Sequence, residues 1–251
     1  MLIALPIHAE SGLRLAYPTE FGVIPAQTFD AGRNRVGDAN VTIEKLESGN
    51  VRMTVDTAVD GGGRTVAHAL LAPINGEIFV QPIFQESRSF DRDGNPLGVL
   101  TLDHRAGKAS CGYPEKGDGK MRFEELPLPE GDRVVNVPLN LLFEPLVKGE
   151  TKTVDFQLLL CRGGARLLDF KAKVARHSDS TKSHEPFVEV SYTPDQGKVL
   201  SFLTQAFIPK LSFWFNPESS KNWLAHRIPL YANGPEVYVV RQGITTTHIF
   251  D

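Results

Sequence analysis

The sequence predicts a mainly β protein in which one large, curved antiparallel meander sheet forms a half-barrel or open barrel with one or two short helices. Three observations support this fold class: apolar and polar residues alternate, turn-forming residues separate neighbouring runs, and helical spacing is rare. The 251 residues read as a single β domain over 1–251, because no linker, repeat or low-complexity tract divides them.

The alternation has a period of two residues, which is the period of a β-strand. It is found in the segments 51–56, 154–160, 168–174 and 188–193. Side chains of a strand point alternately to its two faces, so each segment is expected to bury one face and expose the other. One-sided burial is typical of antiparallel sheets, since parallel strands covered on both faces are apolar throughout.

Turn-forming residues punctuate these runs at hairpin spacing. Asp60-Gly61-Gly62-Gly63 and Asn75-Gly76 each lie between two strand-like segments. Glycine adopts the positive φ of tight turns without strain, and Asn tolerates it, so neighbouring strands are expected to pair in sequence. The runs 78–90 and 97–105 are long, and a wide sheet of long strands must twist and curl.

Two segments have helical signals. Apolar residues between Val199 and Ala206 follow the spacing of an amphipathic helix, with Asp195 in the N-cap position and Pro209 beyond its end. A second stretch of one or two helical turns is expected at 138–143.

Composition and motifs argue against several classes of function. Lys and Arg number 27 against 30 Asp and Glu, a net charge of −3 without a long basic run, so no nucleic-acid partner is expected. No apolar stretch is long enough for a transmembrane helix. The common hydrolase, nucleotide and zinc motifs are missing, so we expect no catalytic residues, no metal and no cofactor. A non-enzymatic role is favoured.

The N-terminus and the two cysteines bear on the compartment. Residues 1–9 are apolar and end in a small residue, and they are interpreted as a signal-peptide remnant or as a disordered or strand-forming start. Cys111 and Cys161 lie at the ends of strand-like runs and are a candidate disulfide, which an oxidising compartment would favour. Two buried free thiols are the alternative, and the sequence favours them slightly.

Aromatic residues gather toward the C-terminus, and among them lie the candidate ligand-binding residues. Trp214, Trp223 and Tyr231 are accompanied there by His226 and Arg227. Such clusters usually pack in a core. The alternative is a concave apolar pocket rimmed by a few polar groups, which is the ordinary form of a small-molecule site.

The same region resembles a known family. Phe213-Trp214-Phe215, followed by the segments 226–231 and 233–241, resembles the ending of bacterial cell-envelope proteins from an uncharacterised domain family. That group is similar in architecture to the periplasmic lipoprotein-carrier fold, a curved antiparallel half-barrel that wraps over helices around an apolar cavity. The resemblance implies this half-barrel fold and a periplasmic or exported location, with a cytoplasmic location as the alternative. It carries over no catalytic residues.

Three hypotheses follow. The first is a monomeric envelope protein that binds a lipid or another hydrophobic molecule on its concave face, with the helix near Val199 packed against that face or gating it. The second is a scaffold that offers a sheet edge or an aromatic patch to a protein partner. The third is a hydrolase or carbohydrate-processing enzyme that uses His104 or His226 with a distant carboxylate. An inner surface filled by the protein's own side chains would exclude the first.

Overall fold

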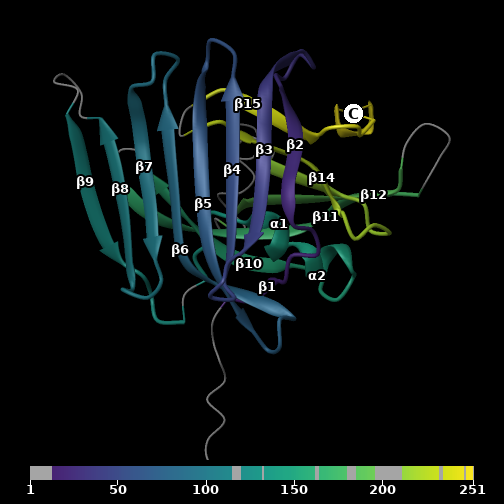
Figure 1. Cartoon of the computed structure of the whole chain (residues 1–251), viewed down its shortest axis with the longest axis horizontal. Coiled ribbons are helices and arrows are strands. Elements are labelled where there is room, and N and C mark those ends of the chain that lie inside the picture. Colours follow the sequence, from purple (N-terminus) through teal and green to yellow (C-terminus); the bar gives the residue numbers. More distant parts are fainter. Residues whose placement is uncertain are drawn as a thin grey trace, which may run out of the picture.

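The computed structural model describes residues 13–114, 120–131, 133–161, 164–179, 185–195, 211–231, 234–245 and 247–250. Within them, fifteen strands form one antiparallel sheet that curls around two short helices (Figure 1). This confirms the predicted fold class. Residues 1–9 and the helix expected at 199–206 lie outside the described residues.

Consecutive strands pair with each other, as the turn signals predict. The path β2 to β9 and the path β10 to β15 are each built in sequence order; β15 then pairs with β2, and β1 pairs with β6. The strands are β1 (Leu15–Ala16), β2 (Gly22–Phe29), β3 (Arg35–Lys45), β4 (Val51–Val59), β5 (Gly63–Ile74), β6 (Phe79–Phe90), β7 (Pro96–Asp103), β8 (Lys108–Pro114), β9 (Met121–Pro127), β10 (Val154–Cys161), β11 (Ala165–Ser178), β12 (Phe187–Pro194), β13 (Leu211–Phe215), β14 (Trp223–Pro229) and β15 (Glu236–Arg241).

Most strands bury one face, as the period-two pattern predicts. On β4, Val51 and Met53 are buried in the main core while Arg52 between them is exposed. The turn before β6 also follows its sequence signal, because Asn75 and Gly76 have φ values of 51° and 66°.

Strands β13 to β15 depart from this rule and are buried on both faces. Their inner face belongs to the main core, and their outer face forms a second cluster that includes Trp214, Leu224 and Tyr238. The C-terminal helix α4 (Thr247–Phe250) covers that outer face, since Ile249 and Phe250 pack in the same cluster. A covered outer face explains why the sequence of these strands is almost continuously apolar.

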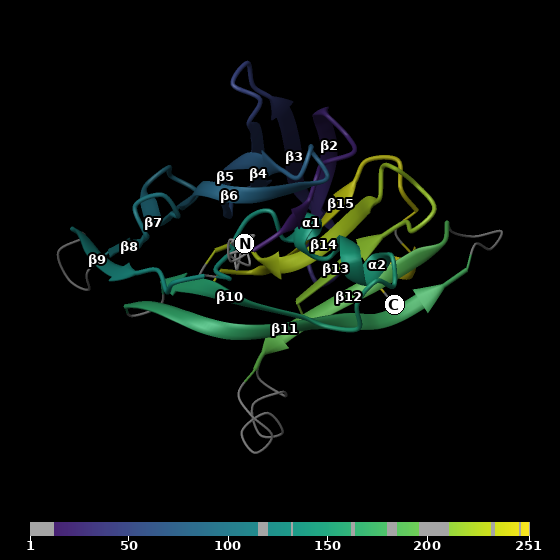
Figure 2. The same ribbon diagram turned by 90° about the horizontal axis from the view of Figure 1, so that it is seen from below.

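The two ends of the sheet meet at a seam, where β8 and β9 approach β10 and β11 (Figure 2). A disulfide joins Cys111 on β8 to Cys161 on β10, with their Cα atoms 5.4 Å apart. Beside it, the Ala165 backbone N–H donates to the Glu124 carboxylate at 2.9 Å. The sheet is therefore barrel-like, but side chains rather than a strand pair connect its two ends. The structure contains the disulfide and not the free-thiol alternative.

Two short helices lie on the concave side of the sheet (Figure 2). They are α1 (Leu139–Leu142), which confirms the helical turn expected at 138–143, and α2 (Glu144–Val147), which follows that segment. Phe143 separates them, and Pro145 lies in the first turn of α2, where its missing backbone N–H costs no helical hydrogen bond. None of the described helices is long and apolar enough to cross a membrane.

Phe143, between α1 and α2, anchors the helices in the core. Its side chain is completely buried, and its ring centroid lies 5.5 to 5.7 Å from those of Phe156, Tyr192 and Phe213 on three different strands. Aromatic rings at such spacing attract each other beyond the effect of burial alone.

Residues 133–137, called the strap below, bring these helices into the interior. The strap lies along the free edge of β10: the Val135 N–H donates to the Gln157 carbonyl at 2.9 Å, and the Gln157 N–H donates to Arg133 at 2.8 Å. Val134 and Gln157 form a parallel bridge. An edge strand that would otherwise present unpaired backbone groups is thus covered.

A buried glutamine fixes the strap to the opposite wall. Gln85 on β6 is inaccessible to solvent, and its Oε1 accepts hydrogen bonds from the backbone N–H groups of Asn136 and Val137 at 2.8 and 2.9 Å. The Asn136 side chain in turn bonds both backbone groups of Leu159 on β10. The strap is therefore held between two walls of the curled sheet.

Candidate functional site

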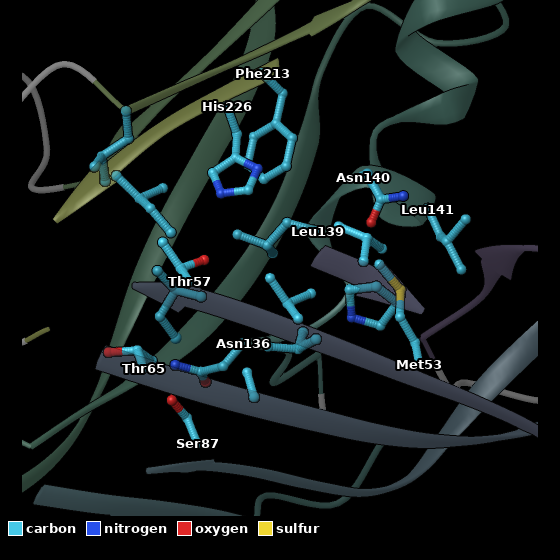
Figure 3. A pocket seen from close by; sticks show the side chains of 18 of the residues that line it. Met53, Thr57, Thr65, Ser87, Asn136, Leu139, Asn140, Leu141, Phe213 and His226 are labelled. Carbon is cyan, nitrogen blue, oxygen red and sulfur yellow. The ribbon is translucent and has the colours of Figure 1, made fainter. Parts of the chain in front are cut away.

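A cavity of about 600 Å³ lies between the inner face of the sheet and the strap with α1. This volume is within the range usual for small-molecule sites. Figure 3 shows side chains of β4 to β6 on one side, Phe213 and His226 of β13 and β14 on another, and Asn140 and Leu141 of α1 on a third. The protein's own side chains leave room for a guest molecule.

Much of the wall is aliphatic or aromatic. It includes inward-facing residues of both halves of the sheet: Ile24, Val41, Ile43, Met53, Val55, Leu158, Phe170, Tyr192, Phe213, Trp223 and Val237. Leu139 and Leu141 of α1 add to it from the centre of the molecule (Figure 3). Such a wall favours an apolar guest through the removal of hydrocarbon surface from water.

Hydroxyl groups line one end of the cavity. Thr57, Thr65, Ser87 and Ser89 all lie on the inner faces of β4 to β6, and the strand register places Thr65 opposite both Thr57 and Ser89. The Thr65 hydroxyl donates to the Leu230 carbonyl at 2.6 Å and lies 3.0 Å from the Ser89 hydroxyl. This end can exchange hydrogen bonds with a neutral polar group.

His226 is the most distinctive polar group of the cavity. It is only 5% exposed, and its ring centroid lies 5.2 Å from that of Phe213 and 5.6 Å from that of Trp223. Burial lowers the pKa of His226 to about 4, so the imidazole is neutral at physiological pH. Its Nε2 atom is buried without a hydrogen-bond partner in the described part of the protein.

A buried polar atom without a partner destabilises the folded protein. The ring of His226 faces the cavity, across from Thr57 (Figure 3). A guest molecule that hydrogen-bonds to Nε2 would remove this penalty.

The charged groups that line the cavity each have a cationic partner outside its wall. Among the described lining residues, the only carboxylates are Glu20 and Glu144, and there is no Lys or Arg. Glu144 lies 2.8 Å from the ammonium group of Lys148, and Glu20 accepts two hydrogen bonds from Arg241 at 2.6 and 2.8 Å. The described wall therefore presents no positive charge to a guest.

The structure separates the five candidate ligand-binding residues into two groups. Trp223, His226 and Tyr231 line the cavity. Trp214 lies on the outer face beside Tyr238, with ring centroids 6.2 Å apart. Arg227 also lies outside the cavity wall, where its guanidinium donates to Glu236 at 2.6 Å.

The reason for this separation is the alternation within a strand. His226 and Arg227 are neighbours in sequence, so their side chains point to opposite faces of β14. Arg227 therefore does not share a ligand group with His226 at the cavity. The prediction that Trp214 and Arg227 belong to the ligand-binding residues is corrected accordingly.

Sequence reasoning missed the hydroxyl end of the cavity, although a signal for it was present. The inward positions of β4 run from Val51 through Met53 and Val55, and the next position in that alternation is Thr57. On β5, the same step from Ala67 leads to Thr65. Extending the alternation past its last apolar residue identifies both hydroxyl groups.

The enzyme hypothesis finds no catalytic pair at the cavity. No carboxylate among the described residues makes a hydrogen bond or ion pair with His226, and its neutral imidazole is surrounded by aromatic rings. His104 does not line the cavity and contacts the Gln85 side chain, with 2.9 Å between the two Nε2 atoms. The alternative in which a sheet edge or aromatic patch binds a protein partner stays a prediction.

Comparison with known proteins adds little to this description. No protein-family model and no curated protein matches the chain. A solved structure with some likeness is the crystal structure of a beta-barrel-like protein of domain of unknown function DUF1849 from Brucella abortus. The identity is 11%, the TM-score is 0.34, and the match covers 92% of this chain and 96% of that one. A TM-score of 0.34 does not show a common fold, and the likeness supports no function.

Proposed function

We propose that the protein binds and carries a hydrophobic small molecule in the cavity between the curled sheet and α1. The observation that supports this most strongly is the unfilled volume of about 600 Å³ behind largely apolar walls. Burial of apolar surface stabilises a complex by roughly 25 cal/mol per Å² removed from water. A guest that fills the cavity has enough apolar surface for stable binding.

The cell envelope is the proposed location. The disulfide at the seam supports it, because such bonds persist in oxidising compartments and are rare in the cytosol. The architecture is also compatible with the lipoprotein-carrier fold implied by the C-terminal sequence, since both have a curved sheet, interior helices and an apolar cavity. In this proposal the protein acts as a monomeric periplasmic or exported carrier.

Titration with N-phenyl-1-naphthylamine, a neutral apolar dye that fluoresces when it leaves water, tests the proposal. The delipidated protein should bind the dye saturably, and tryptophan emission should change with the same midpoint, because Trp223 lines the cavity. Absence of saturable binding by the folded protein would overturn the proposal.

A pair of variants locates the bound dye. Ala67 lines the cavity, so Ala67→Phe fills part of it and should weaken dye binding about tenfold or more. Ala175 is exposed on β11, so Ala175→Phe adds the same atoms outside and should leave the affinity unchanged. Equal affinities for both variants would place the dye elsewhere on the protein.

A further inference from the structure

We infer that the guest of this cavity is an uncharged amphiphile, a hydrocarbon with a hydroxyl group that hydrogen-bonds to the His226 imidazole. This inference rests on the proposed function and restricts it to one chemical class of ligand. In particular, it separates long-chain alcohols from fatty acids and other anionic lipids.

The described part of the cavity wall has no positive charge to attract an anion. No Lys or Arg is found among the described residues that line the cavity, and Glu20 and Glu144 already have cationic partners. A carboxylate or phosphate carried into this space would lose its water without gaining a counter-ion, which is costly in an apolar environment. The described wall thus disfavours anionic guests.

His226 can form a hydrogen bond with a guest in the cavity. A neutral imidazole has one nitrogen that donates and one that accepts, and the tautomer decides which role Nε2 has. A hydroxyl group can donate or accept, so it satisfies Nε2 in either tautomer. A pure hydrocarbon would leave this buried atom unpartnered, as it is in the structure.

Polar side chains are unevenly distributed along the cavity. The inward positions of β4 change from Met53, in the aliphatic part, to Thr57, which lies across from His226 (Figure 3). These positions are four residues, or about 13 Å, apart along the strand. Ser87, Ser89 and Thr65 extend the hydroxyl end over two more strands. The cavity is therefore amphipathic, and its polar end is uncharged.

Displacement of bound N-phenyl-1-naphthylamine by two ligands of equal chain length tests the inference. The competitors are 1-dodecanol and dodecanoate at pH 7.5, which differ only in the polar end. We expect dodecanol to bind about tenfold or more tightly than dodecanoate, since the acid must lose either its water or its charge. Equal affinities, or a preference for dodecanoate, would overturn the inference while dye binding leaves the proposed function intact.

Two variants test the role of His226 itself. His226→Phe keeps a ring but removes the nitrogen atoms, and it should weaken dodecanol binding about tenfold more than it weakens dye binding. His68 is on the outer face of β5, where it contacts Thr54, so His68→Phe is the matched control and should bind dodecanol normally. An undiminished dodecanol affinity in His226→Phe contradicts the assignment.

A measurement on the unaltered protein removes any dependence on the folding of a variant. With ¹⁵N-labelled histidine, the His226 Nε2 resonance should shift when dodecanol is added and should shift much less with dodecane. Identical responses to the two compounds would show that no hydrogen bond forms at this atom. If the dye itself does not bind to the folded protein, the proposed function fails together with the inference.

Discussion

At the scale of single residues, strand alternation decides which polar groups reach the cavity. His226 and Thr57 point inward because each occupies an inward position of its strand. His226 is the only ionisable imidazole among the described lining residues, and burial keeps it neutral. An uncharged imidazole is compatible with an apolar guest at every pH above the pKa of this group.

The buried imidazole predicts a specific dependence of stability on pH. The pKa of His226 is about 4 in the folded protein and 6.5 in an ordinary environment, which applies to the unfolded chain. Below pH 6.5 the unfolded chain therefore binds a proton that the folded protein does not, so stability falls with decreasing pH until about pH 4. From pH 7.5 to pH 4.5 this costs about 2 to 3 kcal/mol.

Urea denaturation of the wild type and of His226→Phe at these two pH values measures the effect. Other groups titrate in both proteins. The contribution of His226 is therefore the difference between the wild type and the variant in the unfolding free energy lost from pH 7.5 to pH 4.5. The wild type should lose about 2 to 3 kcal/mol more unfolding free energy than the variant. Equal losses would mean that the folded imidazole takes up its proton near the ordinary pKa.

At the scale of elements, the strap determines where α1 and α2 lie. Its backbone N–H groups at Asn136 and Val137 depend on one acceptor, the Gln85 side chain, which is completely buried. The helices themselves are one turn each, too short to be stable alone, so packing and this anchor hold them.

Gln85→Leu is therefore expected to destabilise the protein by about 2 to 4 kcal/mol, because two buried N–H groups lose their acceptor. Gln81 is exposed on the same strand, and Gln81→Leu should change the unfolding free energy by less than about 0.5 kcal/mol. Urea denaturation of the two variants provides the measurement. A loss below 1 kcal/mol in Gln85→Leu would show that the strap does not need this anchor.

Elements with a local signal could be predicted from the sequence. The strands have a period-two pattern, the turn at Asn75-Gly76 has residues that tolerate positive φ, and Pro145 follows the helical turn of α1. The strap could not be predicted, because its parallel bridge from Val134 to Gln157 joins residues with no shared local pattern. The packing of α4 in the same cluster as Trp214 likewise joins distant segments of the chain.

Only part of the candidate site could be predicted from the sequence, because some of its residues have a local signal and others come from distant segments. Trp223, His226 and Tyr231 were found because aromatic and polar residues cluster in one stretch of sequence. Trp214 and Arg227 are close to these residues in sequence but lie on the outer face, because consecutive strand residues point in opposite directions. The hydroxyl groups of β4 to β6 come from a distant part of the chain, and only the curl of the sheet brings them opposite His226.

At the scale of the whole molecule, the curl of the sheet encloses the cavity, and the seam holds the curl. The fourteen strands from β10 to β9 form one continuous path whose two ends are not paired with each other. The contacts between the two ends include the Cys111–Cys161 disulfide and the hydrogen bond from the Ala165 backbone N–H to the Glu124 carboxylate. A small apolar cluster that includes Leu102 and Leu159 also joins them.

Because the disulfide links residues 50 positions apart, it restricts the unfolded chain strongly. Loop-closure entropy for 50 residues corresponds to about 4 kcal/mol of stability. The double variant Cys111→Ser/Cys161→Ser, and the wild type treated with dithiothreitol, should both lose about this amount in urea denaturation. The variant should not respond to dithiothreitol, which controls for effects of the reagent elsewhere. If the double variant and the reduced wild type each lose less than about 1 kcal/mol of unfolding free energy, the disulfide adds little to the stability of the cavity wall. Hydrogen bonds and apolar packing at the seam would then suffice to hold the curled sheet together.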